Sequence, residues 1–342
     1  MLCACSSVKY YAQAAHGQGE LVFRRRAVSA IVQDPTTDHA LAARLRLAQQ
    51  ARQFASQRLG LPDNRSYTSY VELRRDYVVW NVFAAPRYSV DPVLYCFPVA
   101  GCVAYRGYFN EAAAKAEVAR LERRGYDVSL GGVSAYSTLG WFADPILSSM
   151  LRWDDDELDS TIFHELAHQL IYVKDDTAFN ESFATFVQTE GLREWRRSRG
   201  LPAQDDRAQA MDAGFTQLVL DLRERLKTLY ASGVSESVMA AGKQREIAAF
   251  REKYQQWRDH DWPQRHDYDA WVAAPINNAR LLPFGLYDQW TPAFGVLFKR
   301  AEGSWPAFYA SVRTLAKLSR AQRELQLQGL LADSKAKTAS VE

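Results

Sequence analysis

The sequence lacks an excess of charge of either sign: 42 Lys and Arg residues stand against 40 Asp and Glu residues, which gives a formal net charge of +2. Proteins that follow nucleic acid phosphates carry a strongly basic surface, so this balance argues against nucleic acid as a partner. Apolar runs of roughly 20 residues, the length that a membrane-spanning helix needs, are also missing, because charged residues or proline interrupt each apolar stretch. The chain is therefore not expected to cross a bilayer.

The chain is long and rich in apolar residues. With 342 residues, 47% of them hydrophobic, it can bury one large core or two smaller cores joined across a cleft. A compact enzyme is therefore the natural class to consider first.

Cysteine is scarce, with four residues in two pairs. Cys96 and Cys102 are six apart and flank a turn-like stretch that could bring two strands together. In an oxidising compartment they could form a disulfide, and in a reducing one they would be small buried residues. The sequence leaves both alternatives open.

The first seven residues, MLCACSS, resemble the end of a bacterial lipoprotein signal, with Leu2 and Ala4 placed before Cys5. The basic segment and apolar run that normally come before such a signal are not in the sequence, so either the start is truncated or misassigned or the match is accidental. The resemblance implies a lipid on Cys5, which would anchor a soluble domain at a membrane. It also implies a periplasmic-facing lipoprotein of the bacterial cell envelope.

Hydrophobic periodicity predicts an N-terminal part in which helices and strands alternate. Gly60, Gly125 and Gly131 mark expected ends or turns, and Asn110 is the expected N-cap of one helix. This order indicates a mixed sheet with helices against it. The expected helices are residues 37–59 and 110–124, and the expected strands are residues 71–83, 93–99, 126–133 and 134–141.

The second half is expected to be mainly helical, over residues 158–173, 179–199, 210–229, 235–257 and 305–318. Residues 259–292 are rich in Trp, Pro, Asn and Tyr and favour irregular structure. The polar end from Ser319 is expected to be frayed or disordered beyond about Ala332. The predicted class is α+β. The predicted divisions are residues 1–36 as anchor or linker, 37–173 as a mixed subdomain, 174–318 as a helical subdomain and 319–342 as a polar tail.

The strongest motif is His-Glu-x-x-His, formed by His164, Glu165 and His168 within TIFHELAHQL. Residues at i and i+4 lie one above the other on a helix, so both imidazoles can reach one metal ion, with Glu165 at its edge. Zn²⁺ accepts such a donor set and keeps a position for water, whose proton Glu165 can accept and pass to a leaving amine. The alternative is a core helix whose two histidines bond to backbone or carboxylates.

One protein ligand is still needed, and Glu181 is the best candidate because it would lie in the first turn of the next helix. Asp175, Asp176 or Glu190 could substitute for it. Asn180 could bond the motif helix, or it could be a local cap. The run from Asp154 to Glu157 fits an acidic first turn better than a second metal site.

His-Glu-x-x-His followed by Asn180 and Glu181 on a second helix resembles the gluzincin peptidases. Together with the lipoprotein-like start, the stretches GCVAYRGYF (residues 101–109), AYSTLGWF (135–142) and NESFA (180–184) resemble a family of bacterial lipoproteins described as zinc aminopeptidases, over most of the chain to about residue 318. The resemblance implies a zincin-like fold with the active site in a cleft between the mixed and helical parts. Known gluzincins place more residues before the third ligand than the twelve found here.

Such peptidases commonly lay the substrate along a strand edge. The expected strand from Val133 to Leu139 would offer Tyr136, Ser137 and Thr138, although these residue types also simply suit a strand. An oxyanion donor is expected in the later irregular stretch, where Asn277 and Asn278 could line a cleft or form a turn. Tyr287, His260 and His266 are further candidates there.

The sequence thus predicts a zinc peptidase, with an aminopeptidase favoured by the resemblance alone. The alternative is a membrane-tethered scaffold or an inactive binding protein that keeps the same fold. Glu165 argues against it, since a purely structural zinc site needs no carboxylate beside an open position. A third candidate is hydrolysis of another amide, such as a cell-wall peptide.

Overall fold

The computed structural model describes residues 2–97, 101–284 and 289–338. Two compact units are present, and each combines segments that are distant in the sequence. The first is drawn from residues 1–80, 132–203 and 286–342, and the second from residues 81–131 and 204–285. The divisions predicted from composition follow the chain in order, whereas these units follow spatial contacts, so the two do not correspond.

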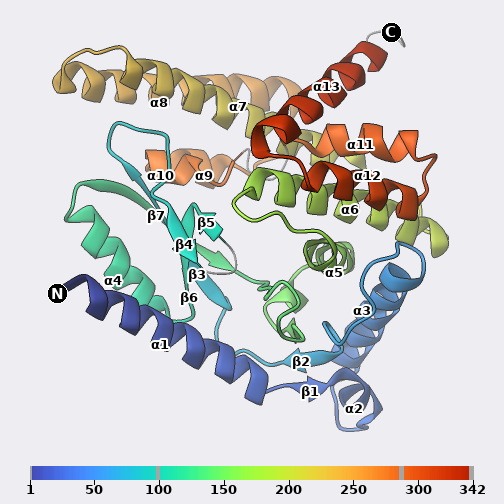
Figure 1. The fold of residues 1–342 in the computed structure, drawn as a ribbon. Coiled ribbons are helices and arrows are strands. Elements are labelled where there is room, and N and C mark those ends of the chain that lie inside the picture. Colours follow the sequence, from blue (N-terminus) through green and yellow to red (C-terminus); the bar gives the residue numbers. More distant parts are fainter. Residues whose placement is uncertain (1, 98–100, 285–288, 339–342) are drawn as a thin grey trace. The chain divides into compact units, whose positions relative to one another are not determined.

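Helices dominate the first unit. In Figure 1, α5 (Asp155–Leu170) lies between α3 (His39–Gln57) and α6 (Thr177–Ser198). A small sheet places β2 (Ser69–Val71) between the antiparallel β1 (Arg26–Ala27) and the parallel β8 (Ile146–Leu147). The unit also contains α1 (Leu2–Phe23), α2 (Val28–Gln33), the 3-10 helix η1 (Met150–Arg152), α11 (Thr291–Arg300), α12 (Trp305–Ala316) and α13 (Arg320–Thr338).

The start of α5 follows from its own sequence. The side chain of Asp154 accepts a hydrogen bond from the backbone N–H of Glu157 at 2.8 Å and so caps the helix. Three acidic residues fill the first turn, where the helix dipole favours negative charge. The predicted acidic first turn is confirmed.

Helices α5 and α6 approach closely at Gly191 of α6. A Cβ atom at this position would lie 2.7 Å from Leu59 Cδ1 and 3.1 Å from Phe163 Cδ2, too close for any larger residue without a shift. The absence of a side chain at this position lets Leu59 and Phe163 pack directly against α6.

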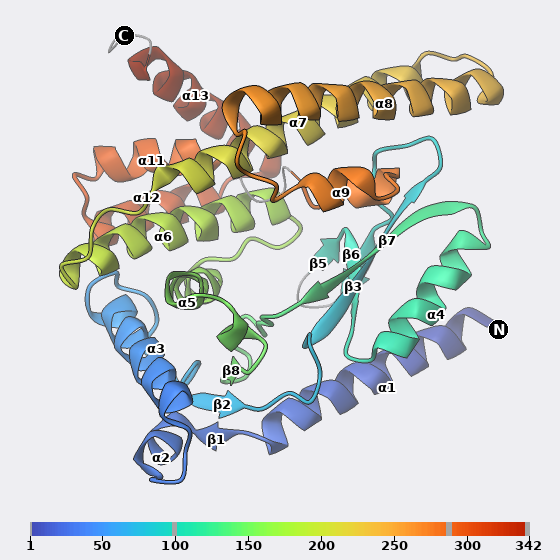
Figure 2. The same cartoon turned by 180° about the vertical axis from the view of Figure 1, so that it is seen from behind.

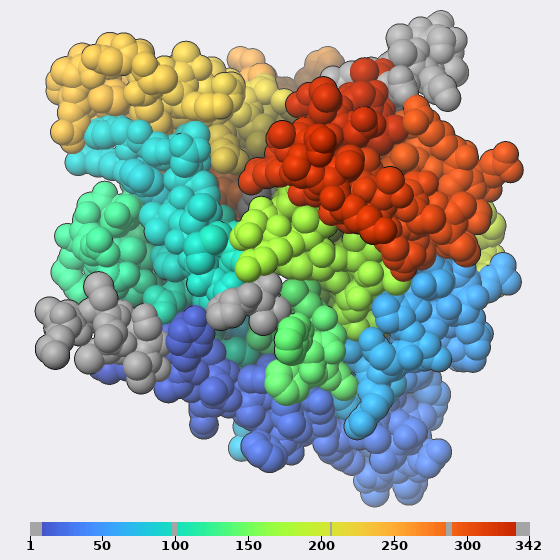
Figure 3. Space-filling model, in the orientation of Figure 1, coloured from blue at the N-terminus to red at the C-terminus, as the bar shows by residue number. Residues whose placement is uncertain are grey.

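An aromatic core joins α6 to the C-terminal helices. The ring of Phe183 lies 5.8 Å from that of Phe294 and 6.1 Å from that of Phe308, and all three side chains are fully buried. Figure 3 shows these C-terminal helices, in red, against the yellow-green atoms of α6. Burial of such rings contributes about 1.5–3 kcal/mol each, so this core fixes the direction of α6.

The second unit holds most of a three-stranded sheet with the order β6-β3-β7. Its strands are β6 (Tyr105–Tyr108), β3 (Val79–Pro86) and β7 (Tyr126–Val133), and α4 (Glu111–Glu122) runs along β6 (Figure 2). The helices α7 (Asp206–Ala231) and α8 (Glu236–Asp261) pack side by side, and α9 (Asp269–Ala273) and α10 (Asn278–Leu281) follow.

A disulfide answers the question that the cysteines left open. Strands β4 (Tyr95–Phe97) and β5 (Gly101–Val103) are antiparallel, and their register places Cys96 opposite Cys102. The two Cα atoms are 3.9 Å apart and the sulfur atoms are bonded. The oxidised alternative is the one that the structure contains.

Much of the predicted helix pattern is confirmed, as are the α+β class and the helical second half. Asn110 caps α4 as expected, through a hydrogen bond from the N–H of Ala113. The predicted strand over residues 71–83 is only partly right, since it is interrupted between β2 and β3. The fraying expected beyond about Ala332 is wrong as far as Thr338, where α13 ends, and the last four residues lie outside the described residues. None of the described helices is both long and apolar enough to span a membrane.

Candidate metal centre and active site

Helix α5 brings the two motif histidines together. His164 and His168 are one turn apart, and their Nε2 atoms face each other at 3.1 Å. Both side chains are largely buried, with 13% and 7% of their surface exposed. Two imidazole nitrogens at this distance need a proton or a cation between them, because two lone pairs would repel.

Helix α6 supplies a carboxylate to the same point. Glu181 Oε2 lies 3.3 Å from His164 Nε2 and 3.5 Å from His168 Nε2. Ligand atoms around a tetrahedral zinc ion, bonded at about 2.0–2.1 Å, are about 3.3–3.4 Å apart. The three atoms therefore have the chemistry and the mutual distances that zinc requires.

The side chain of Glu181 is kept in its ionised form. Its burial would raise its pKa, but the interactions with His168 and His164 lower that pKa well below the usual range. For His168, burial lowers the pKa, while the charge and hydrogen bond of Glu181 and the charge of Glu165 together raise it. The cluster as a whole favours positive charge among its three facing atoms.

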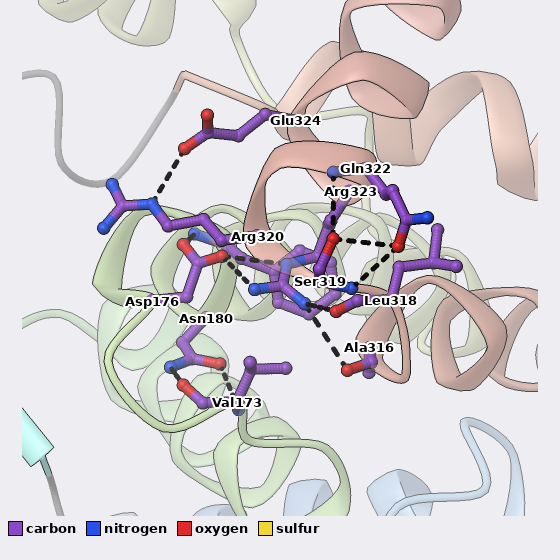
Figure 4. Close-up of polar contacts among 11 residues, drawn as sticks. Val173, Asp176, Asn180, Ala316, Leu318, Ser319, Arg320, Gln322, Arg323 and Glu324 are labelled. Atoms are coloured by element: carbon purple, nitrogen blue, oxygen red, sulfur yellow. Dashed lines mark hydrogen bonds and ion pairs between the residues drawn. The ribbon is translucent and has the colours of Figure 1, made fainter.

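The short connection between α5 and α6 is held by side chains at its end. Asn180 spans it, donating to Val173 O and accepting from Val173 N, both at 2.7 Å. Asp176 caps α6 and binds the guanidinium of Arg323 of α13 (Figure 4). These bonds explain how Glu181 reaches the histidines after only twelve intervening residues. Asn180 thus holds the loop after the motif helix, while Asp176 provides the cap.

The alternative third ligands lie outside the cluster formed by the described residues. Asp176 is committed to Arg323, and Glu190 forms an ion pair with Arg193. Asp175 adopts a positive φ of 64° in the connection. The geometry therefore favours Glu181 over all three.

A residue that the sequence reading missed supports His164. Gln188 follows Glu181 by seven residues, two turns further along α6, and its Oε1 lies 2.9 Å from His164 Nδ1. The Nε2 of Gln188 donates to Ser160 Oγ at 3.3 Å, which turns Oε1 toward the histidine. His164 then carries its proton on Nδ1 and leaves the Nε2 lone pair free for a metal. The i, i+7 spacing from Glu181 was a usable signal for this role.

Replacing Gln188 by Leu is expected to weaken zinc binding about 10–100-fold, because His164 loses the partner that fixes its tautomer and ring orientation. Gln188→Glu keeps an acceptor in place and should retain the affinity. Competition with a chromophoric chelator measures both. Equal affinities of Gln188→Leu and the unchanged protein would show that Gln188 does not orient the ligand.

Glu165 stands beside the cluster. It is half-buried, and its carboxylate has no hydrogen-bond partner among the described residues. Its charge nevertheless acts on His168, Tyr67 and Asp144. A carboxylate that is near the three clustered side chains and still available is what a general base requires.

The predicted substrate strand is wrong. Strand β7 ends at Val133, and the residues that carry Tyr136, Ser137 and Thr138 form a loop. Asp144 explains the difference, because its carboxylate accepts from the N–H of Thr138 at 3.1 Å and from Thr138 Oγ1 at 2.8 Å. These bonds replace the pairing that a strand would need. A substrate role for the three residues remains a prediction without its strand edge.

The later candidates lie in the second unit and already have partners there. Asn277 caps α10, and Asn278 donates to Pro86 O and Arg87 O at 3.0 and 2.9 Å. His260 and His266 are exposed and bond to Asp261 and Asp269. Tyr287 lies outside the described residues. For Asn277 the local structural role is thus favoured. Catalytic or substrate-binding roles for these candidates stay predictions.

A buried acid on the opposite side of α5 gives a pH prediction. Asp159 accepts from Trp195 Nε1 at 2.8 Å, while its Oδ1 has no partner among the described residues, and burial raises its pKa to about 7. The folded state therefore holds this proton more tightly than the unfolded state, and stability falls as pH rises through about 7. The free energy of unfolding should lose about 2 kcal/mol between about pH 5.5 and about pH 8.5 from this group.

Urea unfolding of the protein and of Asp159→Asn, both stripped of metal, checks this expectation. The neutral variant should gain stability relative to the parent as the pH rises across that window. A constant difference between the two proteins would mean that Asp159 titrates in the same way folded and unfolded.

Comparison with family models matches residues 9–327 to the family described as "Putative aminopeptidase". The matched region includes α5, α6 and all three residues of the cluster. Comparison with curated proteins and with solved structures gives no match.

Proposed function

The chain belongs to this aminopeptidase family, and we propose that it is a zinc-dependent aminopeptidase whose metal is held by His164, His168 and Glu181. Family membership supports peptidase activity, and the proposed zinc dependence rests on the cluster of these three side chains. The observation that carries the proposal is the convergence of two imidazole nitrogens and one carboxylate oxygen at 3.1–3.5 Å. Three protein ligands leave one tetrahedral position free, which is typical of catalytic zinc.

When bound, zinc supplies Lewis acidity: it lowers the pKa of water to near 7 and polarises a carbonyl oxygen. Glu165 is the group of this chain that accepts a proton from the attacking water and delivers it to the nitrogen of the leaving amine. Its lack of a competing hydrogen bond among the described residues leaves both oxygens available for this transfer.

The remaining residues position these groups. Gln188 keeps the proton of His164 on Nδ1, so that Nε2 faces the cluster. Asn180 and Asp176 fix the start of α6 and with it the carboxylate of Glu181. Positioning of this kind matters because a displacement of about 1 Å can cost about 10²-fold in rate.

The proposal is tested by metal analysis and hydrolysis together. The purified protein should contain close to one zinc per chain and should cleave aminoacyl peptides, while the same peptides with an acetylated amino end should resist cleavage. Cleavage of both the free and the acetylated peptides would support a peptidase but exclude an aminopeptidase. Zinc without any cleavage would favour a binding protein with this fold, and a protein that takes up no zinc would overturn the proposal.

We also propose that the protein works at the bacterial cell envelope. The disulfide between Cys96 and Cys102 supports this location, because disulfides persist in oxidising compartments. Lipid attached to Cys5 would supply the membrane anchor. Mass analysis of the protein isolated from membranes checks the modification, and its loss in Cys5→Ala would identify the site. A wild-type protein without lipid would refute the anchor.

A further inference from the structure

A cavity of about 480 Å³ lies in the first unit and is lined by Arg25, residues 64–66 and residues 140–143. This volume is within the range of about 300–1,000 Å³ that small-ligand pockets occupy. It is large enough for an amino acid side chain and part of its backbone. The mechanism above gives it no role.

The cavity adjoins the helix face that carries Glu165. Gln169 lies one turn beyond Glu165 on the same face of α5. Its side chain accepts from Asn64 Nδ2 at 2.7 Å and donates to Ser66 Oγ at 3.3 Å, and both partners line the cavity. The cavity is therefore about one helical turn from the residue proposed as the base.

Two arginines give this cavity its charge. Nε and Nη2 of Arg25 are buried and have no partner among the described residues, and Arg65 is exposed with no ion pair to a described carboxylate. Burial lowers the pKa of Arg25, and the nearby positive charge of Arg65 lowers it further while Asp144 opposes both. Two guanidinium groups in this arrangement attract an anion, since each would gain a charge-assisted hydrogen bond.

One carboxylate, that of Asp144, acts on Arg25 and offsets only one of the two positive charges. The carboxylate of Asp144 takes hydrogen bonds from Thr138 N, Thr138 Oγ1 and Ser137 Oγ, with Gln169 Nε2 at 3.5 Å. Its acceptor capacity is thus used by neutral donors of the loop. The positive charge of the cavity remains available to a ligand.

We propose that the cavity binds a carboxylate of the peptide substrate on the leaving side of the scissile bond. This inference rests on the proposed aminopeptidase function. The amino-terminal residue of such a substrate carries an ammonium group, which the two guanidinium groups would repel. The carboxylate belongs either to the free C-terminus of a dipeptide or to an acidic side chain in a longer peptide.

Exposed aromatic residues complete the cavity wall. Trp141 and Phe142 are 70% and 50% exposed, and both line the cavity. The turn that presents them has positive φ angles at Leu139 and Gly140, of 54° and 82°. Their rings can cover the apolar stem of the bound residue while the guanidinium groups hold its carboxylate.

The test compares peptides that differ only in one carboxylate. Ala-Glu-Ala-amide should be cleaved with a kcat/KM about tenfold or more above that of Ala-Gln-Ala-amide, and Ala-Ala should exceed Ala-Ala-amide in the same way. A preference in the first pair alone identifies an acidic side chain as the natural ligand, and a preference in the second pair alone identifies the C-terminus. Equal rates within both pairs would overturn the proposal.

Variants assign the preference to the cavity. Arg65→Gln and Arg25→Gln should each reduce the ratio within a pair, whereas Arg46→Gln, which removes an exposed arginine of α3 outside the cavity, should leave it unchanged. An unchanged ratio in both cavity variants would overturn the proposal.

Binding to Glu165→Gln separates this inference from the proposed function. Calorimetric titration of that variant with Ala-Glu-Ala-amide and Ala-Gln-Ala-amide compares affinities without turnover. Tighter binding of the Glu peptide would support the cavity even if no peptide were cleaved. If the unchanged protein cleaves all the peptides and Glu165→Gln binds the Glu and Gln peptides with equal affinity, the peptidase function is supported and the carboxylate site is refuted.

Discussion

Glu165→Gln is expected to lower kcat for peptide hydrolysis by about 10²–10⁴-fold, because an amide cannot accept the proton of the attacking water. Zinc content should not change, since Glu165 is not among the three clustered residues. The variant should also fold normally, because its carboxylate has no hydrogen-bond partner to lose among the described residues. Steady-state kinetics and metal analysis on the same preparation check both halves of this expectation.

Glu157→Gln is the matched control. Glu157 is exposed and lies in the first turn of the same helix, away from the cluster. Its replacement by Gln removes the same charge. Its kcat should stay within a factor of about two, as for most surface substitutions. If Glu165→Gln retained full activity with zinc bound, the role of general base would have to pass to another residue.

Arg323→Met is expected to lower the free energy of unfolding by about 3–5 kcal/mol, because it leaves a buried carboxylate without its partner. The side chains of Arg323 and Asp176 are only 4% and 6% exposed, and Nε and Nη2 of Arg323 bind the same oxygen of Asp176 at 2.8 and 2.6 Å. Arg323 also donates to Leu318 O at 2.8 Å and stacks over Phe179. Urea unfolding measures the loss.

Two further variants make this result specific. Arg320→Met breaks an ion pair with Glu324 that is 67% and 41% exposed, and it should cost less than about 1 kcal/mol. Adding Asp176→Asn to Arg323→Met removes the stranded charge and should recover part of the stability. A double variant that is less stable than Arg323→Met would show that the cap of α6, and not the ion pair, dominates the contribution of Asp176.

Local signals in the sequence were sufficient for the metal-site candidates. The i, i+4 histidines, the acidic first turn and the next helix are all local features, and the structure places them as expected. The glycine at position 233 also marks the turn between α7 and α8, with a φ of 71°.

Side-chain contacts and helix position account for what the sequence did not reveal. Residues 134–141 have strand-like composition, but Asp144 provides hydrogen bonds that favour a loop. The polar residues after Ser319 look solvent-exposed, yet Arg323 is buried because Asp176 lies opposite. Helix α11 was not predicted, because proline usually interrupts a helix. Pro292 lies in the first turn of α11, where proline is well tolerated. The loop depends on a side chain nearby in the sequence, Arg323 depends on a partner 147 residues away, and α11 depends on the position of its proline.

The ion pair between Asp176 and Arg323 spans 147 residues and has a consequence for biosynthesis. A ribosome makes the motif helix and the start of α6 well before it makes α13. Until then the carboxylate at the N-terminus of α6 lacks its buried partner, and the aromatic core of α6 lacks the rings of α11 and α12. The start of α6, which carries Glu181, is therefore expected to reach its full stability only after the last helices have left the ribosome.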